Sequence, residues 1–177
     1  MPREQMIRTL AVYPSITNLS RHIAFLDAEP SSDTFLPIKL LLDLCHHLSR
    51  DLNYVVRLQE ETQSTLDSFP AYQSEWISDV RIAASDALRR ADSYITSKIP
   101  NISDESTIIN VVGAKSTRSK VKEILNDSMT VAAIERLLSV VHSSVIGVVA
   151  VMHKMALQNS DLVSRGVQSQ RAEISRS

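Results

Sequence analysis

The chain has 177 residues, of which 44% are hydrophobic and 22% charged, the balance of one globular domain that buries its own core. Its 19 basic and 20 acidic residues nearly cancel, so no global field draws it to nucleic acid, and we expect no such partner. Glycine occurs 3 times and proline 6 times, too rarely for the many turns of a sheet-rich domain. Composition therefore predicts an all-α protein.

The start of the chain and its cysteine usage bear on its location. Residues 1–5 lack the apolar stretch of a secretory signal, so we expect an intracellular, cytoplasmic protein, with a peripheral place at a membrane left open. The one cysteine, Cys45, cannot form an internal disulfide. It falls inside an apolar helical pattern, which predicts a small buried hydrophobe and not a reactive thiol.

The first half of the chain predicts a flexible lead and two helices. Residues 1–14 form the lead, and Ser15 or Thr17 can cap a short helix that reaches about residue 28. A long second helix is predicted from about 33 to 68, with Pro37 in its first turn. Its apolar or small positions recur in steps of four and three, the spacing of a seam that faces other helices: Leu41, Cys45, Leu48, Leu52, Val55, Gln59, Thr62 and Leu66.

The second half predicts two more long helices with an irregular stretch between them. The third helix spans about 71–98, and the last spans about 130–158. Residues 101–128 are expected to form a long connection, with a short helix possible near 119–125. The tail, 159–177, is expected to be frayed or disordered. The predicted fold is an up-down four-helix bundle over residues 15–158, with a short N-terminal helix and a long irregular connection before the last helix.

Two local stretches could contact a membrane or a partner. Residues 145–152 are apolar on every side but too short to span a bilayer, so we expect a buried central helix there. The only local basic run lies in the predicted connection and could contact anionic lipid heads or a partner. The alternative interpretation is that the run belongs to a solvated loop without a binding role. The run consists of Lys115, Arg118, Lys120 and Lys122.

No residue pattern points to catalysis or to a bound cofactor. His142 and His153 lie about three helical turns apart and share a face. They lack the inward carboxylates at i, i+3 spacing that bundle metal sites use, so no metal site is predicted. No nucleophile elbow and no paired carboxylates in an apolar setting occur. We therefore predict a non-enzymatic chain that needs no cofactor and no metal.

The order of helices over residues 35–157 resembles a known group. The long helix carries Leu48-Ser-Arg-Asp-Leu-Asn-Tyr-Val-Val-Arg-Leu-Gln-Glu-Glu61, Phe69-Pro70 follows, and the next helix carries Ile82-Ala-Ala-Ser-Asp-Ala-Leu-Arg-Arg-Ala91. Then come Asn126-Asp-Ser-Met129 and Leu138-Ser-Val-Val-His142. This order resembles a helical domain of unknown function from filamentous-fungal proteins and, more distantly, the four-helix bundles of HeLo-type cell-death proteins. The second resemblance implies a bundle that oligomerises and perturbs the plasma membrane.

Two functions follow as expectations. The first is a non-enzymatic interaction or scaffold module, whose partner is another protein or a second copy of the chain. The alternative is a HeLo-like membrane-associating signalling or cell-death bundle, for which an anionic membrane surface is the partner. They differ in whether the basic run is needed for lipid binding.

Overall fold

The computed structural model describes residues 13–26, 36–61, 71–100, 102 and 111–174. The described part contains helices and no strand, so the predicted all-α class is confirmed. The helices are α2 (Pro14–Leu26), α3 (Leu36–Glu61), α5 (Ala71–Lys98), α6 (Val111–Asn126) and α7 (Ser128–Ile174).

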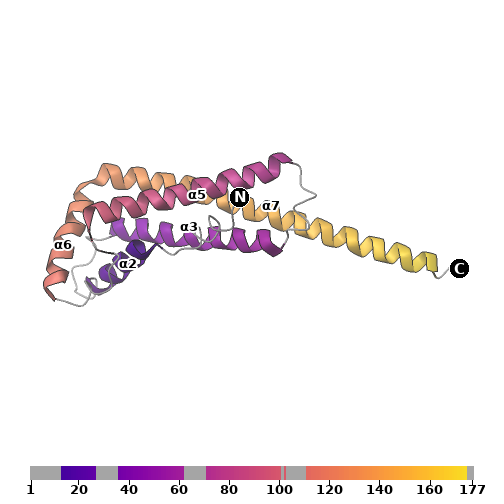
Figure 1. The fold of residues 1–177 in the computed structure, drawn as a ribbon, viewed down its shortest axis with the longest axis horizontal. Coiled ribbons are helices and arrows are strands. Elements are labelled where there is room, and N and C mark those ends of the chain that lie inside the picture. The colour runs from indigo at the N-terminus through magenta and orange to yellow at the C-terminus, as the bar shows by residue number, and fades with distance from the viewer. Residues whose placement is uncertain (1–12, 27–35, 62–70, 101, 103–110, 175–177) are drawn as a thin grey trace.

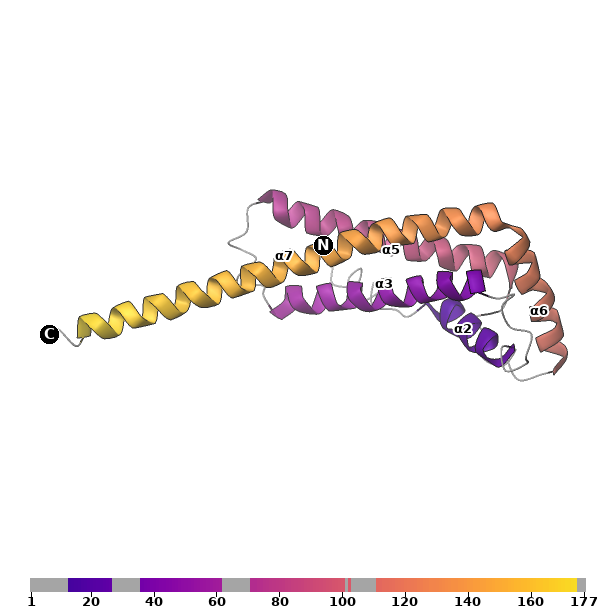
Figure 2. The ribbon, with the colours of Figure 1, turned by 180° about the vertical axis from the view of Figure 1, so that it is seen from behind.

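Three long helices form the body of the molecule (Figure 1). α3, α5 and α7 lie lengthwise beside one another, with α5 running opposite to the other two. α7 packs against both α3 and α5 more extensively than those two pack against each other. α2 and α6 cross the bundle at the end where α3 and α7 begin, as Figure 2 shows from behind. α7 is therefore the helix that holds the other two together.

The predicted seams form the core. In α3 the five seam positions from Leu41 to Val55 are buried, and α5 buries Ile77, Val80, Ala84, Ala87, Leu88, Ala91 and Ile95. Three of the latter are the alanines Ala84, Ala87 and Ala91, whose small side chains let neighbouring helices approach closely. The third helix has the predicted bounds, Ala71–Lys98. The periodicity of the apolar residues thus located most of the core.

The segment before the last helix and the end of the chain are more helical than predicted. α6 fills positions 111–126, where a long connection with a short helix near 119–125 was expected. α7 continues to Ile174, beyond the expected end at 158. Most residues of 159–174 are compatible with helix, and no proline interrupts them. Residues 1–12 of the expected lead and residues 101 and 103–110 of the expected connection lie outside the described residues, and Pro14, expected to end the lead, begins α2.

One residue, Asp127, separates α6 from α7 and caps α7. Its carbonyl accepts a hydrogen bond from the Val131 amide, as an N-cap residue does. Hydrogen bonds from Thr130 lower the pKa of the Asp127 carboxyl, and the nearby Lys98 ammonium, 3.7 Å away, lowers it further. Tyr94 donates to the same carboxylate at 3.1 Å. The junction is thus attached to the C-terminal end of α5.

Gly147 lies in the middle of α7 beside the indole of Trp76 from α5. A Cβ built on Gly147 would lie 3.9 Å from Trp76 Cη2, an ordinary van der Waals contact. Glycine inside a helix costs about 1 kcal/mol relative to alanine. We therefore expect Gly147→Ala to raise the melting temperature by roughly 2–4 °C, measured by circular dichroism. A lower melting temperature would show that the indole cannot accommodate the methyl group.

Candidate interaction surface

The basic run lies on α6, which crosses the end of the bundle (Figure 1). Lys120 is half-buried, and its Nζ lies 3.5 Å from the Lys98 carbonyl oxygen, to which it donates. Lys122 is exposed. Lys115 and Arg118 belong to the same helix, but their side chains lie outside the described part of the structure. The run is therefore helical, and of its two described members only Lys122 points freely to solvent.

A more extensive surface runs along α7, on the side turned away from the core. Eight exposed positions recur in strict steps of four and three, the spacing of a coiled-coil seam. We call them the outer face of α7: Ala132, Arg136, Ser139, Ser143, Ile146, Ala150, His153 and Leu157. The helix therefore carries two seams, an apolar one buried in the bundle and a mixed one of apolar and polar residues open to solvent.

The outer face is uncharged over most of its length. No Asp, Glu, Lys or Arg occurs between Arg136 and Lys154, a distance of about 27 Å along a helix. Large apolar side chains on and beside the face are well exposed: Ile146 by 53% and Leu157 by 69%. The expectation that residues 145–152 are buried all round is therefore wrong, because three long helices leave one side of α7 uncovered.

The serines on this side of α7 do not make it strongly polar. Ser143 Oγ donates to the Ser139 carbonyl at 3.0 Å, and Ser144 Oγ donates to the Val140 carbonyl at 3.3 Å. Each hydroxyl proton is thus used within its own helix, one turn back. Because these two hydroxyls already donate within the helix, covering them with another small or apolar surface costs little free energy of desolvation.

Two polar contacts join α7 to α3, one through His142 beside the outer face and one through His153, which belongs to it. His142 Nε2 lies 2.8 Å from Asp51 Oδ2, and His153 Nε2 lies 2.8 Å from the Tyr54 hydroxyl. Burial would raise the pKa of Asp51, but hydrogen bonds from His142 and Arg50 outweigh it and lower that pKa. The His142 ring also stacks on His47, with ring centroids 6.4 Å apart. These contacts fix the rotation of α7 and hence the direction of its outer face.

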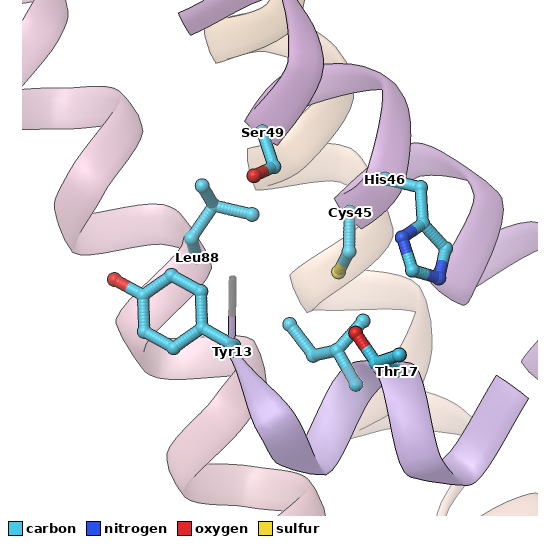
Figure 3. A pocket seen from close by; sticks show the side chains of 7 residues that line it. Tyr13, Thr17, Cys45, His46, Ser49 and Leu88 are labelled. Carbon is cyan, nitrogen blue, oxygen red and sulfur yellow. The ribbon is translucent and has the colours of Figure 1, made fainter. Parts of the chain in front are cut away.

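A small hollow between α2, α3 and α5 offers no ligand site (Figure 3). Tyr13, Thr17, Cys45, His46, Ser49 and Leu88 line it, and its volume of about 10 Å³ suits a single water molecule. Thr17 Oγ1 is buried there without a hydrogen-bond partner in the described structure. Burial raises the pKa of the Cys45 thiol to about 12, so this thiol stays protonated and unreactive. The prediction that Cys45 is a buried hydrophobe is confirmed.

Two further properties concern metals and membranes. Among the described residues, no three His, Cys, Asp or Glu side chains are grouped so that they could hold a metal ion.

One described helical stretch, Ser128–Gln158, is long and apolar enough to cross a membrane by length and composition. Core helices of soluble proteins meet the same criteria, but only 28% of its most apolar window is buried. Most of this stretch therefore lies outside the core.

The fold and this surface define an all-helical protein with an open apolar helix face. No protein-family model matches the chain, and no curated protein and no solved structure is significantly similar to it.

The outer face was not recognised from the sequence, although its signal is present there. Residues 132–157 carry two overlapping patterns with steps of four and three, and the stronger one, through Leu138, Val145 and Met152, forms the buried seam. Half of the weaker pattern consists of alanine and serine, which apolar periodicity does not mark. The contacts of His142 and His153 were missed because their partners lie on α3, 91 and 99 residues earlier.

Proposed function

We propose that this protein is a non-enzymatic interaction module, an up-down four-helix bundle of α2, α3, α5 and α7 that acts inside the cell and binds a protein partner through the outer face of α7. The observation that carries the proposal is the exposed seam without charge between Arg136 and Lys154. Exposed apolar patches of this kind mark interaction sites. Burying one isoleucine side chain contributes about 1.5–3 kcal/mol, so Ile146 and Leu157 would dominate binding.

The geometry of the bundle supports binding on this side. α3 and α5 flank α7, and the two contacts from Asp51 and Tyr54 keep the helix from rotating. A surface held in one orientation loses little conformational entropy when a partner binds. Four of the eight outer-face residues are small, Ala132, Ser139, Ser143 and Ala150, so a partner helix can approach closely beside them.

An in-cell photo-crosslink tests the proposal. A photoreactive amino acid replaces Ser143 in the full chain, and the adducts are separated by mass in the expressing cells. We expect a discrete adduct that disappears when Ile146→Glu is added. Ile82→Glu is the matched control, since Ile82 on α5 is exposed by 49% and lies outside the outer face, so the adduct should persist. No adduct, or an adduct indifferent to Ile146→Glu, contradicts the proposal.

A HeLo-like membrane-associating bundle is the second candidate. It is favoured by the stretch Ser128–Gln158, whose length and composition suit a membrane, and by the exposed Lys122 on the neighbouring α6. Near an anionic surface each such charge contributes about 1 kcal/mol. Co-sedimentation with anionic and neutral liposomes separates the two candidates. Binding to anionic liposomes that is lost on charge reversal of Lys120 and Lys122 would favour the membrane, and binding unchanged by that double variant would exclude this mechanism.

A further inference from the structure

We propose that the partner of the outer face is the same face of a second copy of this chain, with the two α7 helices antiparallel and centred between Ser143 and Ile146. This inference rests on the proposed function and names the partner of that surface. A twofold pair requires a surface that is complementary to itself, and the side chains of α7 meet this requirement in one orientation.

The sizes of the outer-face residues match in the antiparallel pair. About the chosen centre, Ser143 of one copy faces Ile146 of the other, and the exposed isoleucine fills the space above a small residue. In the same register Ala132 faces Leu157, again a small residue against a large, exposed one. Ser139 faces Ala150, two small residues that let the backbones approach. Two of the four facing pairs therefore join a large apolar side chain to a small one, which favours close packing.

The parallel arrangement of the same faces is worse. Each residue would then face its own copy, so Ile146 would meet Ile146 while Ser139, Ser143 and Ala150 would leave gaps on either side. Arg136 would also face Arg136, and like charges held together cost free energy. In the antiparallel register Arg136 faces His153 instead, so the two guanidinium groups stay apart. Charge and size therefore both select the antiparallel pair.

The C-terminal part of α7 gives an independent reason for a second copy. Residues 159–174 are helical and project past the ends of α3 and α5 (Figures 1 and 2). A helical segment of this length, about 24 Å, is marginal in water without packing. In the antiparallel pair the projecting segment runs past the beginning of the partner's α7 and towards the partner's α6. The second copy thus lies beside the part of α7 that extends past the described helices α3 and α5 of its own chain.

Cysteine crosslinking tests the orientation. Ala132→Cys and Leu157→Cys are made in separate full-length chains, both at exposed positions, while the native Cys45 stays buried. We expect a disulfide-linked species of twice 19.7 kDa when the two variants are mixed and oxidised. Neither variant should crosslink alone, because positions 132 and 157 lie about 37 Å apart along the helix. Crosslinking of Ala132→Cys alone would show a parallel pair and overturn the proposed orientation.

Mass in solution tests the association itself. Light scattering of the wild-type chain should give a dimer, and Ile146→Glu should raise the Kd at least about tenfold because a charge is buried opposite Ser143. The control Ile82→Glu should stay dimeric. The wild-type chain is measured at about 100 µM, far above the Kd of a stable dimer. A mass of 19.7 kDa at this concentration, that of a single chain, would overturn self-association. In that case an in-cell adduct of another mass would still support the interaction surface, so the two proposals fail separately.

Discussion

Leu138→Ala is expected to lower the free energy of unfolding by about 2–5 kcal/mol, a fall in melting temperature of roughly 10 °C for a chain of this size. Leu138 lies on the buried seam of α7 and is fully buried, with 0% of its surface exposed. Truncation leaves a cavity where α7 meets α3 and α5, and close-packed neighbours fill such a cavity only in part. Thermal unfolding followed by circular dichroism at 222 nm measures the effect.

Val140, two residues further on, is the matched control. It belongs to the same helix but is 62% exposed, so Val140→Ala should change the free energy of unfolding by less than about 0.5 kcal/mol. A large loss for Leu138→Ala with almost none for Val140→Ala would show that only one side of α7 is needed for folding. Equal losses would mean that Val140 is covered in solution, and dilution of the wild-type chain would then show whether a second copy covers it.

Helix identity and the buried seams could be predicted from the sequence because both depend on local periodicity. The third helix was located to the residue, since Pro70 precedes it and Pro100 follows it. The first helix ends at Leu26 and the second begins at Leu36, each within three residues of its expected bound. α6 was underestimated because Ser, Asn and Gly113 weaken the apolar pattern that marks a helix.

The side of α7 that stays open could not be predicted, because it depends on how many helices surround it. In sequence, residues 145–152 are apolar throughout, which suggests burial on all sides. In the structure Val145 and Val148 are buried, whereas Ile146 and Ala150 are exposed. Periodicity gives the rotation of a helix but not the number of its neighbours. The candidate surface therefore emerges only from the packing of α3 and α5 around α7.

Asp51→Asn should lower the free energy of unfolding at pH 7 by about 1–2 kcal/mol, since hydrogen bonds to charged groups exceed neutral ones. The loss should depend on pH in a defined direction. The pKa of Asp51 is lower in the folded chain than its ordinary value of 3.8, so the contribution of the carboxylate is complete above about pH 4. It disappears as the pH falls through the folded pKa. Melting temperatures of both chains between pH 7 and pH 3 should therefore converge at the acid end.

The contact between Asp51 and His142 survives mild acidification, because His142 Nε2 can donate to the carboxylate both as the cation and in one neutral tautomer. Arg50, whose Nε lies 3.0 Å from Asp51 Oδ1, stays charged throughout, and the His47 ring stacks on the His142 ring. Asp43→Asn, at an exposed position two turns earlier on α3, is the control and should show no such convergence. A difference between Asp51→Asn and wild type that is constant down to pH 3 would mean that the carboxylate does not fasten α7 to α3. The direction of the outer face would then depend on the buried seam and on Tyr54 alone.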